Sequence, residues 1–360
     1  MGSAASSLPS PNIEVIRSGP CLSYHQKCKL TTEVSDLEIV AAIKGMPLDK
    51  TPGVDGFPIE FFIQHWSLIK TDVIDAVMEF LKTGRMLKAF SCTAISLVPK
   101  VSTPTQVKRV IGTLVSPAQT AFIEGRSIID NIMFSHELLK WYSRKGLSPR
   151  CVMKIDLRKA YDSIEWSFLK SVLAELGFPF KFIQWVMECI SSVSYSLVLF
   201  GGLTKPFKGR RGIRQGDPYL FVNVMEYLQR ELTQVGQNKD FKFHPRCKKL
   251  GVMHICFADD LLMFCKADMI SIQLLRGAFQ RFSDASGLQA NTEKSQVYMA
   301  GVKPNLKQEI LTTLGYLEGS IHFNYLGVPL SSKKLTITQC LPIIEKVTEK
   351  LRCWSAKLFD

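Results

Sequence analysis

Three aspartates stand beside apolar runs, where an unpaired carboxylate is costly. Asp156 follows the β-rich run 151–155, and Asp259 and Asp260 are adjacent within the apolar stretch 253–264. The apolar flanks predict two strands that meet at a tight turn of residues 258–260. Adjacent carboxylates repel each other, and apolar surroundings add a desolvation cost. Divalent cations would offset both effects: Mg²⁺ prefers carboxylate oxygen, and two such ions roughly 3.5–4 Å apart clamp the attacking and leaving oxygens in phosphoryl transfer.

Ordinary local structure is the alternative for most of these acids. Aspartate is common in turns, so Asp259 and Asp260 taken alone are also typical of an exposed turn. Asp162 and Glu165 have the spacing of a helix-start box, which gives Asp162 a capping role. Asp156 has no such explanation, because no helix is expected to start there.

The chain is basic and rich enough in apolar residues to fold. Its 360 residues carry a net charge of +13, and 46% of them are apolar, which excludes bulk disorder and favours a polyanionic partner. One stretch, residues 205–214, contains five cationic residues and no acid. Such a run is either a solvated face or a track for nucleic-acid phosphates. Its cations are Lys205, Lys208, Arg210, Arg211 and Arg214.

Several classes of protein are excluded by what the sequence lacks. The ten cysteines are scattered with no C-x-x-C pair, so neither a zinc site nor a disulfide scaffold is expected, and a reducing compartment fits best. No apolar run is long enough to cross a bilayer, and the first twenty residues lack a secretory pattern. We therefore expect an intracellular protein of the nucleus or cytoplasm, without a membrane partner.

The expected elements form a mixed α+β pattern. A capping box of Ser35 and Glu38, with Val34 and Ile39 as a hydrophobic staple, predicts a helix over 36–44. Residues 1–30 and 100–117 are expected to be irregular. The other expected helices cover 59–83, 128–142, 164–176, 180–191, 219–234 and 268–285. The expected strands are 94–98, 151–155, a hairpin over 252–266, 295–300 and 321–326, with two short strands around Gly201 and Gly202.

Seven segments, in this order and spacing, resemble the reverse transcriptase domain of non-LTR, LINE-type retrotransposons of the kind found in plants. The resemblance runs from about Leu37 to the C-terminus. The segments are residues 50–58, 118–127, 154–166, 211–218, 257–260, 287–295 and 325–330.

The resemblance implies a right-hand polymerase of fingers, palm and thumb, with an antiparallel palm sheet and α+β fold class. It implies RNA-directed DNA synthesis with an RNA template, a DNA primer, deoxynucleoside triphosphates and two Mg²⁺ ions, Mn²⁺ being an alternative. The implied divisions are a loose arm at 1–30, a fingers-like region at 31–150, a palm at 151–300, and a primer grip with the start of a thumb-like region at 301–360.

The resemblance also assigns roles residue by residue. Asp156, Asp259 and Asp260 are the implied metal-binding and catalytic carboxylates, and Lys294 is the implied proton donor to pyrophosphate, with a surface ion pair as its alternative. The implied nucleotide contacts are Leu157, Arg158, Tyr161, Gln215 and Gly216, with core packing as the alternative for the Tyr161 ring. Tyr325, Leu326 and Gly327 are the implied primer grip, with an ordinary buried strand as the alternative.

The chain departs from the family in two places. The stretch between residues 100 and 116 is much shorter than in the family, which leaves the fingers incomplete, and about three residues are missing after Pro218, which shifts the face of the following helix. The flanking endonuclease is absent as well, so a truncated and internally shortened copy is expected. The alternative function is therefore a catalytically impaired, nucleic-acid-binding remnant of the same family.

Overall fold

The computed structural model describes residues 8–46, 57–86, 110–195, 198–199, 202–203, 207–213, 217–332 and 336–338, with 341, 344–345 and 348. The chain forms two compact units. The first unit comprises Met1–Ser116, Lys159–Arg230 and Arg281–Leu288, and the second comprises Pro117–Arg158, Glu231–Gln280 and Gln289–Asp360. Each unit is assembled from separate segments of sequence, and the boundaries expected for fingers, palm and thumb stay a prediction.

The second unit is built on a five-stranded sheet in the order β6-β7-β1-β8-β9. Every neighbouring pair is antiparallel except β8 and β9, which are parallel. The α+β class and the strands expected at 151–155, 252–266 and 295–300 are confirmed. The strands are β6 (His254–Phe257), β7 (Asp260–Lys266), β1 (Arg150–Ile155), β8 (Gln296–Ala300) and β9 (Leu317–Glu318).

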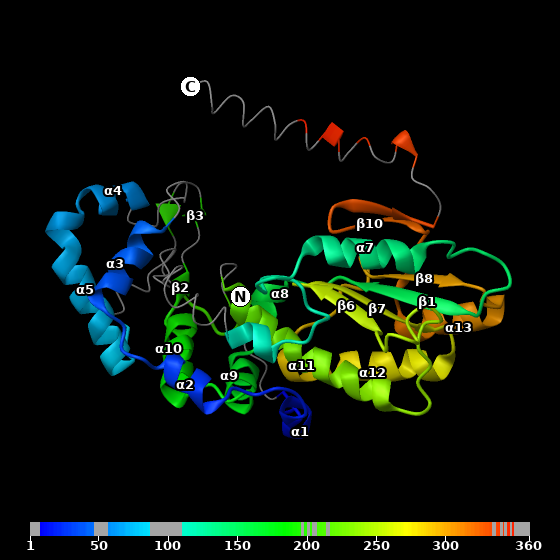
Figure 1. The fold of residues 1–360 in the computed structure, drawn as a ribbon, viewed down its shortest axis with the longest axis horizontal. Helices are drawn as coiled ribbons and strands as arrows, with labels where there is room; N and C mark the ends of the chain where they lie inside the picture. Colours follow the sequence, from blue (N-terminus) through cyan, green and yellow to red (C-terminus); the bar gives the residue numbers. More distant parts are fainter. Residues whose placement is uncertain are drawn as a thin grey trace. The chain divides into compact units, whose positions relative to one another are not determined.

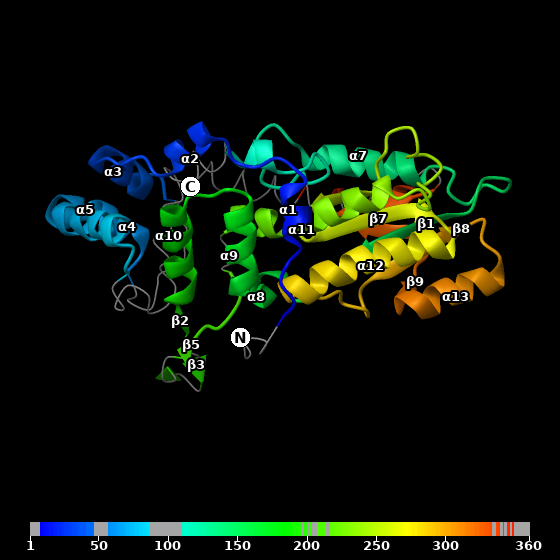
Figure 2. The same ribbon diagram turned by 90° about the horizontal axis from the view of Figure 1, so that it is seen from below.

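Helices cover both faces of this sheet (Figures 1 and 2). Helix α7 (Ile128–Leu139) packs on one face and α12 (Met269–Ser286) lies along the other. Successive strand residues point to opposite faces, so Val152 joins the buried cluster under α7 while Met153 faces the other way. Because both faces are covered, β1 and β7 are buried at almost every position. A further helix, α13 (Pro304–Leu314), precedes β9.

A second hairpin packs against α7. It pairs β10 (His322–Tyr325) with β11 (Val328–Ser331), which confirms the strand expected at 321–326. Leu326 and Gly327 form its two-residue turn, with φ angles of 51° and 81°. Two consecutive positive φ angles are the pattern of a type I′ turn, whose twist matches the flanking strands.

The first unit is mainly helical. Short strand pairs join β2 (Ser194–Tyr195) to β5 (Phe207–Lys208) and β3 (Val198–Leu199) to β4 (Gly202–Leu203). Its helices are α1 (Ile13–Arg17), α2 (Tyr24–Leu30), α3 (Asp36–Lys44), α4 (Ile59–Gln64), α5 (Trp66–Thr83), α8 (Ala160–Ser163), α9 (Trp166–Glu175), α10 (Phe180–Ser191) and the part of α11 (Pro218–Gln237) that precedes residue 231.

Helix caps explain where several of these helices begin and end. The predicted capping box is present at α3: the Ser35 hydroxyl accepts from the Glu38 backbone N–H, and the Glu38 carboxylate accepts from the Ser35 N–H. Gly84, with φ 68°, ends α5 as a left-handed cap. The single helix expected over 59–83 is instead α4 and α5, because His65 leaves helical geometry and its ring nitrogen bonds the Phe61 carbonyl.

The prediction of irregular structure at 1–30 and 100–117 was wrong where those residues are described. Helices α1 and α2 are too short to show periodicity, but Asn12 caps the first and a box of Ser23 and Gln26 caps the second. Residues 110–114 are also helical and largely buried. The strand expected at 94–98 and the stretch 100–109 lie outside the described residues. In the described helices, none has the length and apolar character needed to span a bilayer.

Candidate active site

Asp156 and the Asp259–Asp260 turn lie at the same end of the second unit's sheet. Strand β1 ends at Ile155, which pairs with Leu261 of β7, so continuing the register by one residue sets Asp156 opposite Asp260. The β6–β7 hairpin closes with Phe257 paired to Asp260, which leaves a two-residue turn of Ala258 and Asp259. The sheet therefore places all three acids at one end of its strands.

The carboxylate of Asp260 is affected by the other two acids. Burial raises the pKa of Asp260 above its ordinary value, and the negative charges of Asp259 and Asp156 raise it further, while Lys154 lowers it. Asp156, Asp259 and Asp260 are each half-buried rather than free in solvent. The site is thus a cluster of like charges that is partly removed from water, which is unfavourable unless a cation is bound.

The donor chemistry of this cluster suits a hard divalent cation, although the ligand set is not closed. Within the described residues, no group of three or more His, Cys, Asp or Glu side chains is arranged to hold a single metal ion. Carboxylate oxygens are nevertheless the ligands that Mg²⁺ prefers, and Mg²⁺ usually takes one or two carboxylates together with water and substrate phosphate. The carboxylates of Asp156, Asp259 and Asp260 fit that kind of open site.

The segment 289–295 fixes the backbone around Asp156. The Asn291 N–H donates to the Asp156 carbonyl at 2.7 Å, and the Asp156 N–H donates to the buried Ser295 hydroxyl at 3.1 Å. Leu157 forms a bridge with Ala290 beside them, and the Arg158 N–H donates to the Gln289 carbonyl at 2.8 Å. Lys294 is exposed and directly precedes Ser295. The expected proton donor and the expected carboxylate therefore stand on neighbouring segments.

Lys154 is a residue of this site that the sequence reasoning did not single out. Its ammonium group lowers the pKa of Asp260 and donates to the Asn324 carbonyl of β10 at 2.8 Å. It thus connects the carboxylate cluster to the β10–β11 hairpin. The available signal was the two-residue period of a strand, which puts Lys154 and Asp156 on one face.

Of the expected primer-grip residues, Tyr325 is only 1% exposed and belongs to the core cluster under α7. Its side chain therefore matches the buried-strand alternative. Leu326 and Gly327 stand at the tip of the hairpin instead.

Gln119 is a second residue of this site that was not predicted from the sequence, although it lies within the segment 118–127 on which the resemblance rests. Its side chain is fully buried and hydrogen-bonds both backbone groups of Ala258, the residue that precedes Asp259. Ala258 has φ 54°, a left-handed conformation that residues with a β-carbon rarely adopt. The turn that presents the two aspartates is thus held by a buried amide.

Tyr161 lies in the first unit, where a loop adjoins it. Its half-buried ring stacks on Phe221 with ring centres 4.6 Å apart. The Ile213 N–H donates to the Tyr161 carbonyl at 2.8 Å, and Gly212, with φ 90°, packs against the Asp162 backbone where a β-carbon would collide. Residues 212–213 therefore run beside Tyr161. Gln215 and Gly216, the next expected nucleotide contacts, lie outside the described residues.

The basic stretch is only partly free to bind phosphate. Lys208 and Arg210 are exposed, whereas Arg211 pairs with the buried Glu165 at 3.5 Å. Lys205 and Arg214 lie outside the described residues. Asp162 lies within α8 and caps no helix, so its expected capping role was wrong. Helix α9 begins at Trp166, and its N-cap residue Glu165 makes no side-chain cap, because that carboxylate faces Arg211.

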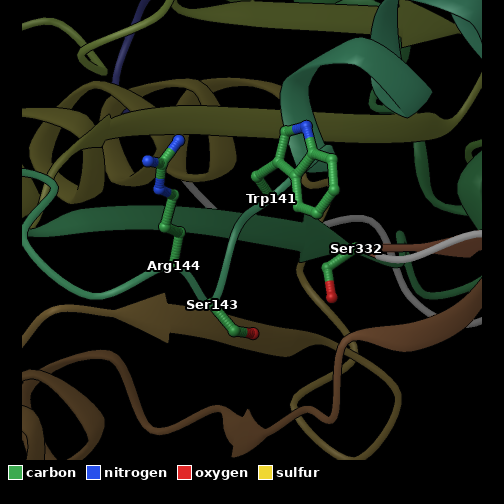
Figure 3. Close-up of a pocket in the computed structure, with 4 residues that line it drawn as sticks. All are labelled: Trp141, Ser143, Arg144 and Ser332. Atoms are coloured by element: carbon green, nitrogen blue, oxygen red, sulfur yellow. The ribbon is translucent and has the colours of Figure 1, made fainter.

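A pocket in the second unit lies away from the acids. It is lined by Trp141, Ser143, Arg144 and Ser332 (Figure 3). The buried Arg150, at the start of β1, donates to the Arg144 carbonyl, so the pocket adjoins the end of β1 opposite Asp156. This pocket is therefore not the candidate active site.

Comparison with known proteins identifies the family of the chain. The family model described as "Reverse transcriptase (RNA-dependent DNA polymerase)" matches residues 98–330. An uncharacterized 149 kDa protein of transposon TX1 from Xenopus laevis is 26% identical over 93% of this chain and 27% of its own length. The Pol polyprotein of the type-2 retrotransposable element R2DM from Drosophila melanogaster is 28% identical over 57% of this chain and 19% of its own length. The chain thus spans about a quarter of the first of these relatives.

Among solved structures, telomerase from Candida tropicalis in complex with a telomeric RNA fragment aligns with a TM-score of 0.44 and 12% identity, over 76% of this chain and 40% of that one. Apo telomerase from the same organism aligns with a TM-score of 0.44 and 11% identity, over 74% of this chain and 48% of that one. The assignment rests instead on the family model. Because that model matches more than half of the chain, the chain belongs to the reverse transcriptase family.

Proposed function

We propose that this chain is the polymerase portion of a non-LTR retrotransposon protein, which copies an RNA template by extending a DNA primer with deoxynucleoside triphosphates. The observation that carries the proposal is the meeting of Asp156 with the Asp259–Asp260 turn at one end of the sheet. Family membership supports the reaction, and the relatives named above are proteins of transposable elements.

The carboxylates are proposed to hold two Mg²⁺ ions, or Mn²⁺ in their place. Asp156 and Asp259 supply the principal oxygens, Asp260 stands beside them, and the Leu157 carbonyl is an additional donor. When bound, the ions favour ionisation of the primer 3′-hydroxyl and stabilise the charge on the departing pyrophosphate. The like-charge repulsion around Asp260 supports this assignment, because cation binding relieves it.

The remaining residues position the substrates. Tyr161 is proposed to lie beneath the incoming sugar and to disfavour a ribose 2′-hydroxyl. Lys294 donates a proton to pyrophosphate, and Arg158 contacts the nucleotide. Gln215 and Gly216 line the new base pair. In this assignment the five-stranded sheet is the palm of a right-hand polymerase.

Nucleic-acid phosphates are proposed to follow exposed cations of the 205–214 stretch, of which Lys208 and Arg210 are described and exposed. The Leu326–Gly327 turn, rather than the buried Tyr325 ring, contacts the primer. Lys154 ties that hairpin to the carboxylates and so sets the primer end near Asp260.

Primer extension tests the proposal. With an oligo(dT) primer on poly(A), Mg²⁺ and labelled dTTP, the chain should incorporate nucleotide, and Asp259→Asn should lower the rate by at least about 10²-fold. Salt-dependent binding without incorporation would overturn the polymerase assignment in favour of a nucleic-acid-binding remnant. A broad, non-cooperative melt would show instead that the chain does not form a working domain.

A further inference from the structure

The turn that carries Asp259 contains a backbone conformation that its sequence does not favour. Ala258 has φ 54°, in the left-handed region that glycine adopts readily and alanine does not. Two-residue hairpin turns ordinarily place glycine, asparagine or aspartate at such a position. Alanine persists there only if surrounding groups over-determine the turn.

Gln119 provides that constraint. Its side chain is 0% exposed, its Oε1 accepts from the Ala258 N–H at 3.0 Å, and its Nε2 donates to the Ala258 carbonyl at 3.3 Å. The same Oε1 accepts from the Ala121 N–H at 3.0 Å. A primary amide thus pairs with Ala258 as a neighbouring strand would, satisfying one donor and one acceptor at once.

The amide is itself held rigidly against strand β6. The Cys256 N–H donates to the Ala118 carbonyl at 2.8 Å, and the Thr120 N–H donates to the Cys256 carbonyl at 3.1 Å. The buried Asn131 side chain donates to that same Cys256 carbonyl at 3.1 Å. These bonds satisfy the outer edge of β6 and fix Gln119 on both sides.

We propose that Gln119 is a positioning residue of the polymerase reaction, which holds the Ala258 turn so that Asp259 and Asp260 face Asp156. The inference rests on the proposed function. Gln119 acts through the Ala258 backbone and touches no reacting atom. A buried amide costs free energy unless both its groups are bonded, and here each group has a bond to the residue before the acidic pair.

Substitution at two positions separates positioning from simple support of the fold. Gln119→Leu removes both bonds to Ala258, together with the bond from Ala121, and lets the turn relax, so kcat should fall about 10–100-fold and half-maximal rate should require more Mg²⁺. Ala258→Gly makes the left-handed turn intrinsically favourable. In the double variant Gln119→Leu/Ala258→Gly, the glycine should restore at least about half of the loss in log kcat. The reason is that a glycine turn depends less on the two Gln119 hydrogen bonds to residue 258, which we call the clamp.

Tyr142→Phe is the matched control. It removes another buried hydrogen bond of the second unit, from the Tyr142 hydroxyl to the Tyr298 carbonyl at 3.0 Å, away from the turn. It should lower the melting temperature while leaving kcat and the Mg²⁺ requirement unchanged. If Gln119→Leu behaves like this control, or if Ala258→Gly gives no recovery, the positioning role is wrong.

Hydrogen exchange of the full-length chain tests the clamp without any catalytic readout. The Ala258 amide should exchange at least about tenfold faster in Gln119→Leu, and at the wild-type rate in Tyr142→Phe. Faster exchange in a chain that shows no primer extension would overturn the proposed function while retaining the clamp. An unchanged exchange rate in Gln119→Leu would overturn the clamp whatever the activity of the wild type.

Discussion

Two groups of buried or half-buried charges in this molecule are arranged in opposite ways. In the first unit, Arg230 and Glu226 are each almost fully buried and pair at 2.9 Å, and the guanidinium also donates to the Ile16 and Pro20 carbonyls. The second oxygen of Glu226 accepts from the Ser116 N–H. In the second unit, three carboxylates of one sign adjoin each other with Lys154 as the cation beside them.

The two arrangements differ in what they do: the ion pair stabilises the fold, whereas the carboxylate cluster is typical of a functional site. A buried charge whose every polar atom has a partner joins segments that are distant in sequence, here α1, α11 and the chain before residue 117. A cluster of like charges is costly to keep, and such clusters concentrate at functional sites. Substitutions within each of these two groups should therefore show whether activity or stability responds.

The largest effect should come from removing charge at the carboxylate cluster. Asp156→Asn and Asp259→Asn should each lower the primer-extension rate by about 10²–10³-fold and leave the melting temperature within a few degrees of wild type. The physical reason is that the amide retains the shape but not the charge that attracts a divalent cation. Equal activity in either variant, measured at saturating Mg²⁺, would remove that residue from the site.

Removing the cation of the buried Arg230–Glu226 ion pair should instead lower the stability of the fold. Arg230→Met leaves Glu226 buried without its cation, so the free energy of unfolding should fall by about 3–5 kcal/mol in urea denaturation. Arg17→Gln is the matched control, because Arg17 pairs with Glu175 while 66% exposed, and it should cost less than about 1 kcal/mol. Similar losses in both variants would mean that the buried pair contributes no more than a surface one.

Asp260 links stability to pH. Because folding raises the pKa of its carboxyl above the ordinary 3.8, its favourable contribution is complete below that pH and is lost as the pH rises through the raised value. Asp260→Asn should therefore raise the melting temperature at neutral pH by about 2–4 °C and give no gain below pH 3.8. Added Mg²⁺ should reduce the difference in melting temperature between Asp260→Asn and the wild type, because it stabilises the wild type. A gain that is constant with pH would contradict the like-charge account.

The smallest effect concerns the basic stretch. Replacing exposed Lys208 and Arg210 together by glutamine should reduce the slope of log binding constant against log salt by about 2 for a primer–template duplex. The control replaces exposed Lys29 and Lys82 of the first unit, with the same change in net charge. Equal reductions in the two double variants would indicate that net charge, rather than a phosphate track, drives binding.

The sequence allowed prediction where an apolar run, alone or beside a helix cap, determined the element. Alternating and continuous apolar runs located β1 and the β6–β7 hairpin, and the Ser35–Glu38 box located the start of α3. Apolar strands that end at acids located Asp156 and the Asp259–Asp260 turn separately, and only the resemblance to the family predicted that they form one site. Short helices such as α1 and α2 were missed because their stability comes from caps and distant contacts rather than periodicity.

Contacts between distant segments could not be predicted. Gln119 and Cys256 are 137 positions apart, and nothing in the sequence indicates that residues 118–120 pair with the edge of β6 or that the Gln119 amide bonds the turn beyond it. The same holds for Glu165, whose spacing from Asp162 indicated a cap but whose carboxylate faces Arg211. These assignments depend on which backbone groups remain unpaired after the sheet and helices form.

The most direct test of the central claim is to locate cations in crystals of the chain soaked with Mn²⁺. Anomalous scattering should show at least one Mn²⁺ peak between the Asp156 and Asp259 carboxylates in the wild type, and no peak there in Asp259→Asn. Ordered electron density with Mn²⁺ bound elsewhere, and with Asp156 turned away from the turn, would contradict the account.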